Sequence, residues 1–299
     1  MVRGSKSFAL ASKLFDRQTR ERAWLLYAWC RKCDDIADGQ DHGGAMTGVT
    51  DGQARLAAMR AQTDAALRGD ATGDLAFDGF GLVMRECAIP RRYAHDLLEG
   101  FALDAVDWRP TTEADMLRYC YHVAGAVGCM MAVLMGVHPQ DEATLDRACD
   151  LGLAFQLANI ARDIGEDQQA GRCYLPQQWL EEMGIPPGRQ MEPAFRPQLT
   201  LLAQRLTSLA ADYEASARHG TGALPPRAAW AVLAAAGIYG DIAREVARRG
   251  ARAWDDRVVT PKSEKLGWVC GAGIQILGRS SRWPASAARP PHLWTRPRG

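Results

Sequence analysis

The stretch Leu-Ala-Phe-Gln-Leu-Ala-Asn-Ile-Ala-Arg-Asp-Ile-Gly-Glu-Asp, residues 153–167, combines an apolar helical pattern with a polar stripe. Gln156, Asn159 and Asp163 follow one another at intervals of three and four residues, so they share one face of a helix. Asp167 extends that face by one more turn. The stretch therefore predicts a mostly apolar helix that carries amides and carboxylates along one side.

A second acidic cluster, Cys-Arg-Lys-Cys-Asp-Asp-Ile-Ala-Asp, occupies residues 30–38. Asp34 and Asp38 are again four residues apart, which on a helix brings their Cβ atoms to about 5–6 Å. Two like charges at this spacing destabilise an isolated helix unless a cation lies between them. The chain thus contains the same electrostatic arrangement twice.

Two such carboxylate pairs suit a divalent cation bound together with a phosphate group. Mg²⁺ prefers oxygen ligands, keeps several waters and is typically held by one or two carboxylates plus substrate phosphates. On facing helices the pairs would form a trough in which metal ions connect the protein to a diphosphate and neutralise a leaving group. The basic neighbours Arg31, Arg162 and Arg172 also suit a metal–diphosphate complex.

Acidic residues near a helix end are more often solvated surface charge, and for either cluster alone that reading is the simpler one. Both clusters, however, follow apolar helical sequence, at 24–29 and at 153–158. A purely solvent-exposed face is therefore not expected at either position. Glu166 and Asp35 lie beside the two pairs and are secondary candidates.

The composition of the 299 residues is that of an ordinary globular protein, with 47% hydrophobic and 24% charged residues. The 36 basic and 35 acidic residues give no global field for nucleic acid or strongly anionic lipid, so an anionic ligand must be held by local chemistry. Eight scattered cysteines without a signal peptide predict free thiols in the cytoplasm. The longest apolar run, 123–137, falls short of the ~20 residues that span a bilayer and is expected to be a buried helix.

Helical periodicity runs through nearly every segment, and no convincing strand pattern is found. We therefore expect a single all-α domain over 1–279, followed by a Pro/Arg-rich tail over 280–299 that is irregular or mobile. The longest helix is expected over 141–167. Thr112 and Asp115 have the spacing of a capping box. Turn signals separate the helices at 39–52, 68–73, 89–90, 108–112, 136–140, 184–187 and 224–226.

Five ordered motifs resemble those of the squalene/phytoene synthase family, over about residues 4–280. They are Ser5-Lys6-Ser7-Phe8, Tyr27-Ala28-Trp29-Cys30-Arg31-Lys32-Cys33-Asp34-Asp35-Ile36-Ala37-Asp38, Arg118-Tyr119-Cys120-Tyr121-His122-Val123-Ala124-Gly125-Ala126-Val127-Gly128, Gln156 to Asp167 as quoted above, and Gly171-Arg172-Cys173-Tyr174-Leu175-Pro176. The resemblance implies an all-α isoprenoid synthase bundle with a central cavity. It also implies head-to-head condensation of two prenyl diphosphates through a cyclopropylcarbinyl diphosphate.

The resemblance further assigns roles to individual residues. It implies that Mg²⁺, with Mn²⁺ as an alternative, is held by Asp34 and Asp38 at one site and by Asp163 and Asp167 at the other. Contacts with the diphosphate, the prenyl chain or the reacting carbons are implied for Ser5, Ser7, Phe8, Tyr27, Arg31, Tyr119, Gln156, Asn159 and Tyr239, with Arg257 and Lys265 as weaker candidates.

Independently of the family, a carbocation needs a dry cavity with π faces, which Phe8, Tyr27, Tyr119 and Phe155 could supply. Aromatic core packing explains these four equally well. Gly125 and Gly128 fit either a polyprenyl chain lying against the backbone or close helix–helix contact.

Within the family, the motif wording and the tail resemble those of bacterial phytoene synthases. Two geranylgeranyl diphosphates would then give phytoene without reduction, so NADPH is not expected, and Gly271-Ala272-Gly273 is not a dinucleotide fingerprint. Because a C40 product does not cross water easily, we expect peripheral membrane contact, with downstream carotenoid enzymes as candidate partners.

Several alternatives remain open on the sequence. Squalene or dehydrosqualene synthases act on two farnesyl diphosphates, and chain-elongating prenyltransferases or terpene cyclases share the pattern of the first aspartate cluster. A non-catalytic scaffold relative would have no need of both carboxylate pairs. Cys30-x-x-Cys33 could be a redox or zinc motif, but no second cysteine or histidine pair completes it.

Overall fold

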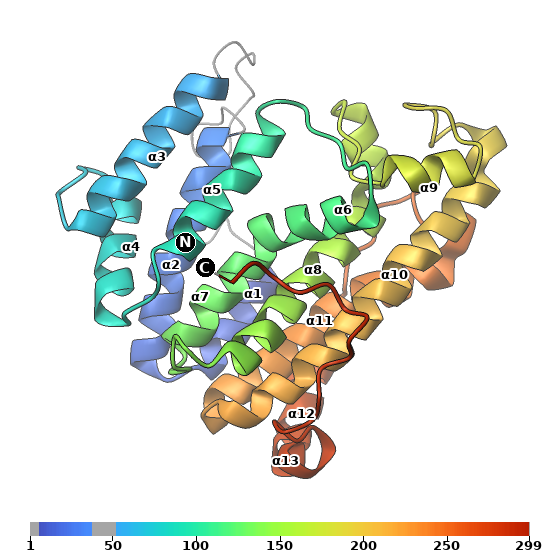
Figure 1. Ribbon diagram of the computed structural model, residues 1–299. Coiled ribbons are helices and arrows are strands. Elements are labelled where there is room, and N and C mark those ends of the chain that lie inside the picture. The colour runs from blue at the N-terminus through green and yellow to red at the C-terminus, as the bar shows by residue number, and fades with distance from the viewer. Residues whose placement is uncertain (1–5, 38–51, 299) are drawn as a thin grey trace.

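The computed structural model describes residues 6–37 and 52–298, and this part of the chain is helical without a β-strand (Figure 1). The all-α prediction is confirmed. The α-helices are α1 (Lys6–Ala11), α2 (Arg17–Ala37), α3 (Gly52–Arg68), α4 (Leu75–Glu86), α5 (Arg92–Asp104), α6 (Glu113–Cys120), α7 (Ala126–Leu134), α8 (Glu142–Gln169), α9 (Gln177–Glu182), α10 (Arg196–Arg218), α11 (Pro226–Arg249), α12 (Lys262–Leu277) and α13 (Arg279–Arg282). Shorter helical turns are η1 (Ser12–Leu14), η2 (Tyr121–Gly125), η3 (Pro193–Phe195), η4 (His219–Ala223) and η5 (Gly250–Arg252), of which η2 is a π-helix.

The helix starts follow local chemistry that the sequence carries. At α6 the capping box is present, since the Thr112 hydroxyl accepts from the Asp115 amide and the Asp115 carboxylate accepts from the Thr112 amide. At α8 the Asp141 carboxylate accepts from the Thr144 amide. The longest helix therefore begins where predicted and continues for 28 residues.

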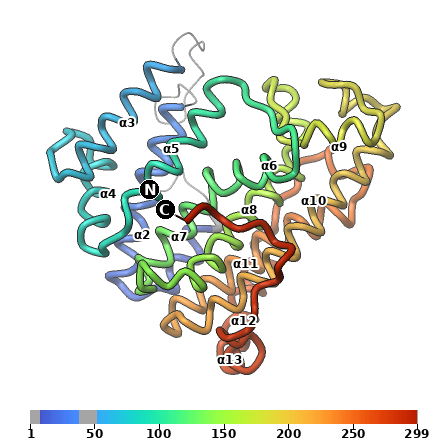
Figure 2. The backbone as a smooth tube through the Cα atoms, in the orientation of Figure 1, coloured from blue at the N-terminus to red at the C-terminus, as the bar shows by residue number. Residues whose placement is uncertain are grey.

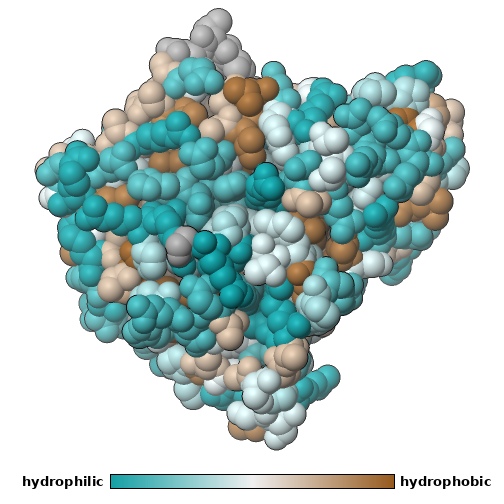
Figure 3. Space-filling model, viewed as in Figure 1, coloured by the Kyte–Doolittle hydropathy of each residue, from teal (hydrophilic) through white to brown (hydrophobic). Residues whose placement is uncertain are grey.

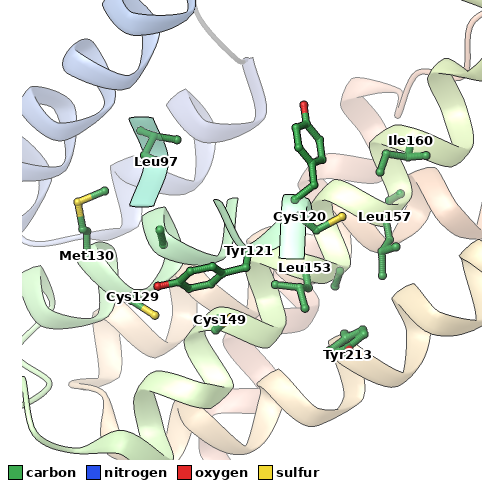
Figure 4. Packing of buried hydrophobic residues seen from close by; sticks show 14 of the residues in the cluster. Leu97, Cys120, Tyr121, Cys129, Met130, Cys149, Leu153, Leu157, Ile160 and Tyr213 are labelled. Carbon is green, nitrogen blue, oxygen red and sulfur yellow. The ribbon is translucent and has the colours of Figure 1, made fainter. Parts of the chain in front are cut away.

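α8 lies at the centre of the bundle and packs against α10, α11, α7 and η2 (Figure 1). On one side its buried residues meet Tyr121 and Cys129, and Tyr213 of α10 lies on the other (Figure 4). A Cβ added to Gly152 of α8 would lie 2.5 Å from the Ala124 carbonyl oxygen. This glycine lets α8 lie directly against the backbone of η2.

Gly125 and Gly128 take part in the same close approach. A Cβ at Gly125 would lie 2.9 Å from the Cys149 sulfur, and one at Gly128 would lie 2.5 Å from the Ala148 carbonyl oxygen. Helix–helix contact therefore accounts for both glycines. Gly128 also lines the central cavity described below.

The apolar run 123–137 contains the end of η2 and all of α7 and is largely buried, as expected. By length and composition alone, one helical stretch of the described residues, Glu113–Leu134, could cross a membrane, but 61% of its most apolar window is buried inside the protein. Core helices of globular proteins give the same result. On the face shown in Figure 3, hydrophilic side chains predominate.

The C-terminal segment 283–298, which follows α13, is irregular and packs against the bundle. It runs from α13 across the front of the molecule towards α7 (Figure 2). Leu293 is buried in the core, and the guanidinium of Arg289 forms an ion pair of 2.6 Å with Asp150 of α8. Arg296 is buried against Glu142 and Asp146. The segment is thus part of the folded domain.

The close approach of α8 and η2 predicts the effect of one added methyl group. Gly152→Ala is expected to lower the free energy of unfolding by about 1–3 kcal/mol, because backbone atoms cannot move aside as a flexible side chain could. Urea unfolding followed by circular dichroism measures the change.

Gly267→Ala in α12 is the matched control, because nothing lies within 4 Å of its added Cβ. There the better helix propensity of alanine should raise stability by up to about 1 kcal/mol. Equal effects of the two substitutions would contradict the packing of α8 on η2.

Candidate active site

A cavity of about 480 Å³ lies between α2, α7, α8 and α11. Its walls are mostly apolar and include Leu26, Met131 and Leu151. Along α8 the lining extends from Thr144 to Asn159, which is about 22 Å at 1.5 Å per residue. Such a volume and lining suit an elongated hydrocarbon.

Two stacked aromatic pairs face this cavity. Phe8 of α1 stacks on Tyr27 of α2 with ring centroids 4.5 Å apart. Phe155 of α8 stacks on Tyr239 of α11 at 4.3 Å. All four are half-buried, so each pair offers π surface to the cavity, which can stabilise a cation there.

The polar stripe of α8 begins inside the cavity and continues beyond it. Gln156 and Asn159 line the cavity, as does Asp34 from α2. Asp163 lies one turn further along α8. It accepts a hydrogen bond of 2.7 Å from Arg162 Nε and forms an ion pair of 3.2 Å with Arg257. Arg257 also pairs with Glu166. The stripe thus leads from an apolar chamber to a cluster of charges.

Asp167 is the most perturbed carboxyl of this stripe. Burial, followed by the negative charge of Asp163, raises its pKa to about 7, and Asp104 of α5 acts in the same direction. Arg172 and Arg162 act in the opposite direction. Burial and the neighbouring carboxylates thus outweigh the arginines and disfavour the charged form of Asp167, which a cation bound beside it would favour.

Tyr119 lies beside this acidic cluster and does not line the cavity. Its ring stacks between Trp108 and Tyr174, at centroid distances of 5.7 and 4.8 Å. Its hydroxyl donates to the Asp104 carboxylate at 3.0 Å, and the Tyr174 hydroxyl donates to the same group at 2.9 Å. Burial raises the pKa of Tyr119 well above its ordinary value, so this hydroxyl stays protonated.

The remaining predicted residues lie apart or fall outside the described residues. Arg31 does not line the cavity and forms an ion pair of 2.6 Å with Asp35. Ser5 and Asp38 lie outside the described residues, and of Ser7 only the backbone position in α1 is described. Lys265 is in α12.

The Cys30-x-x-Cys33 pair has none of the properties of a redox or zinc motif. Both cysteines are free thiols on a helix, and burial raises the pKa of each. Such thiols are poor nucleophiles and poor metal ligands at neutral pH.

Comparison with known proteins gives a consistent result. The profile of the squalene/phytoene synthase family matches residues 1–264. The chain belongs to the squalene/phytoene synthase family.

Named members are similar over almost the whole chain. A phytoene synthase of Pseudescherichia vulneris is 46% identical over 99% of this chain and 96% of its own length, and a 15-cis-phytoene synthase of Pantoea ananas is 47% identical over the same shares. Among solved structures, a ligand complex of a dehydrosqualene synthase superposes with a TM-score of 0.82 at 27% identity, covering 93% of this chain and 94% of that one. The isoprenoid synthase fold is thereby confirmed.

The acidic residues of this family member fit the magnesium ions that the resemblance implies. Among residues 6–37 and 52–298, no three acidic, histidine or cysteine side chains gather as a metal site by themselves. Carboxylates in pairs are nevertheless the donor set of a Mg²⁺ that keeps waters and takes phosphate oxygens. Asp163 and Asp167 are four residues apart on α8, and Asp34 lines the cavity from α2, so carboxylates of this kind are present here.

Two functional candidates were missed by sequence reasoning. Asp104 contributes a third carboxylate near Asp163 and Asp167, and Arg147 lines the cavity far from them. Neither lies in a motif. Asp104 reaches its place through the packing of α5 on η2 and α7, and Arg147 through the packing of α8 on α10. Tyr174 did lie in a quoted motif, without an assigned role.

Tyr119 and Tyr174 share Asp104 as hydrogen-bond acceptor, so their contributions to folding free energy should be coupled. Tyr119→Phe and Tyr174→Phe should each cost about 1 kcal/mol of folding free energy, and the double variant should depart from additivity by about 0.5 kcal/mol or more, because both hydroxyls donate to Asp104. A double-mutant cycle of urea unfolding measures the coupling.

Tyr213→Phe combined with Tyr119→Phe is the control cycle, since the Tyr213 hydroxyl instead accepts from the Trp294 amide. That cycle should be additive within about 0.5 kcal/mol. Additivity in both cycles would contradict the shared site.

Proposed function

We propose that this protein condenses two molecules of geranylgeranyl diphosphate head to head, through prephytoene diphosphate, to phytoene in carotenoid biosynthesis. The observation that carries the proposal is an elongated apolar cavity, faced by two stacked aromatic pairs, that leads along α8 to a cluster of carboxylates. The similarity to phytoene synthases at 46–47% identity over 99% of the chain supports the C20 substrate.

The apolar and the polar residues along α8 would have different roles. The apolar lining would take up the prenyl chains and exclude water, so that a carbocation meets ring faces such as those of Tyr27 and Phe155. Asn159 and Gln156 would orient the allylic ends near the charges. The overall reaction joins the two C20 chains into one C40 skeleton and releases two diphosphates and two protons, one proton in each of its two stages.

The carboxylates would hold the metal that the diphosphates require. The proposed ligands of Mg²⁺ or Mn²⁺ are Asp34 on α2, Asp38, which lies outside the described residues, and Asp163 and Asp167 on α8. When bound, Mg²⁺ neutralises the departing diphosphate. Arg257 and Arg162 form ion pairs with Asp163 and would contact the diphosphate as well.

Incubation with prenyl diphosphates tests the proposal. Geranylgeranyl diphosphate with Mg²⁺ should give phytoene at the same rate with and without NADPH, because no hydride is consumed. Chromatography with mass detection identifies the product. A C30 hydrocarbon from farnesyl diphosphate with no C40 product would favour a squalene or dehydrosqualene synthase, and no hydrocarbon from either substrate would refute the enzyme.

Charge removal tests the proposed ligands. Asp34→Asn and Asp163→Asn should each lower kcat at least about a hundredfold while the protein stays folded, because an amide binds Mg²⁺ far more weakly than a carboxylate. Asp212→Asn on the exposed face of α10 is the control and should retain activity. Activity of Asp163→Asn close to that of the original chain would remove Asp163 from the metal site.

We also propose that the protein contacts an anionic membrane surface through α12. This 16-residue helix is rich in apolar residues, yet Ala272 is the one residue it fully buries. Leu266, Ile274 and Leu277 lie on its exposed side, with exposures of 58%, 74% and 89%. The exposed basic residues Lys262 and Arg282 stand near its two ends and would complement lipid phosphates.

Vesicle flotation tests this contact. The protein should float with vesicles that contain phosphatidylglycerol, and Ile274→Asp with Leu277→Asp should abolish flotation. Leu75→Asp is the matched control, because Leu75 is 89% exposed on α4, away from this face. Equal loss in the control, or concentration-dependent dimers in place of vesicle binding, would refute a lipid contact by α12.

A further inference from the structure

The cavity has a charged residue at the end opposite its carboxylates. Arg147 lines the cavity together with Thr144 and Thr221, twelve residues before Asn159 on α8, which corresponds to about 18 Å. The Arg147 side chain is almost fully buried, at 5% exposure. A buried guanidinium at the end of an apolar chamber is costly to cover with hydrocarbon.

Arg147 is fixed by two hydrogen bonds. Its Nη1 donates to the Ser216 hydroxyl at 2.6 Å, and its Nη2 donates to the Ala287 carbonyl oxygen at 2.6 Å. Gly220 of η4 packs against its stem, since a Cβ there would lie 2.8 Å from the Arg147 Cβ. One of the two hydrogen bonds thus comes from the C-terminal segment.

The same segment also neutralises the carboxylate that would otherwise attract Arg147. Arg289 binds Asp150 through Nε and Nη2, at 2.9 and 2.6 Å, and Ser216 donates to the same carboxylate. Asp150 is three residues from Arg147 on α8, a spacing at which opposite charges pair on a helix. Without Arg289, Asp150 would compete with the cavity position for the guanidinium.

The anchoring of the segment extends over the first half of α8. Glu142, Asp146 and Asp150 follow one another every four residues, so they form one acidic face. Arg296 pairs with Glu142 and Asp146, and Arg298 pairs with Asp146 at 2.6 Å. The arginines of these ion pairs follow residue 264, where the match to the family profile ends.

We propose that the C-terminal segment 283–298 holds Arg147 as the end wall of the prenyl cavity and thereby sets the longest prenyl chain that the protein accepts. The proposal rests on the proposed binding of prenyl chains in this cavity. Arg147 is a positioning and specificity residue in this account and takes no part in the chemistry.

Binding of two unreactive analogues tests the end wall. Titration calorimetry would compare the S-thiolodiphosphates of the C20 and C25 prenyl alcohols, with Mg²⁺ present. The original chain should bind the C20 analogue more tightly, and Arg147→Met should shift the ratio of the two Kd values at least about tenfold towards C25, since one or more methylenes gain a place in an apolar pocket. Arg289→Gln should shift it in the same direction.

Arg298→Ala is the matched control, because this exposed arginine anchors the same segment without contact to Arg147 or Asp150. Its ratio should match that of the original chain, even where its Tm falls. If Arg147→Met does not fold, Arg289→Gln and Ser216→Ala carry the test. An unchanged ratio in a folded variant of Arg147, or equal shifts in Arg289→Gln and Arg298→Ala, would overturn the proposal.

The outcome separates this proposal from the proposed reaction. Binding of the analogues without hydrocarbon product from geranylgeranyl diphosphate would refute the proposed reaction. The ratio of the two Kd values would then still test the role of Arg147 as the end wall. Phytoene formation with an unchanged ratio would refute the end wall alone. Failure of the original chain to bind either analogue would refute both.

Discussion

Burial of α8 is the constraint on which the rest of the structure depends. A 28-residue helix through the centre of a bundle must bury nearly all of its sides, yet this one carries acidic residues near both ends. Charges cannot stay unpaired inside a protein without large cost. The two ends of α8 meet this requirement in different ways.

At the N-terminal end of α8 the negative charges are balanced by the chain itself. Arg289, Arg296 and Arg298 of the C-terminal segment pair with the acidic face of the helix. At the other end Asp163 has arginine partners, whereas Asp167 keeps a pKa of about 7 because of burial and its acidic neighbours. The carboxylates at the N-terminal end of α8 are thus paired within the protein, whereas those at the C-terminal end suit a cation that binds together with a ligand.

The cavity lies along α8 between these ends, which explains why its lining changes along its length. Phe155, Gln156 and Asn159 face it near the carboxylates, and Ala148 and Arg147 face it near the C-terminal segment. The close contact of Gly152 with η2 sets how α8 lies against α7, the next wall of the cavity. Packing and site geometry are therefore parts of one arrangement.

The sequence predicted the helices and the polar stripe because both depend on neighbours in the chain. Caps such as Thr112 and Asp141, and the intervals between Gln156, Asn159 and Asp163, are local features. Asp104 and the anchoring of Arg289 on Asp150 could not be predicted, since they arise between residues 139 apart or on different helices. Likewise, a Pro/Arg-rich composition predicted an irregular tail and gave no sign of the buried carboxylates that hold it.

A crystal structure with geranylgeranyl S-thiolodiphosphate and Mg²⁺ tests the central claim most directly. The account predicts the diphosphate and metal between Asp34 and the Asp163–Asp167 face, with a prenyl chain running along α8 towards Arg147. A diphosphate bound away from both acidic faces, or a chain outside the cavity, would contradict it.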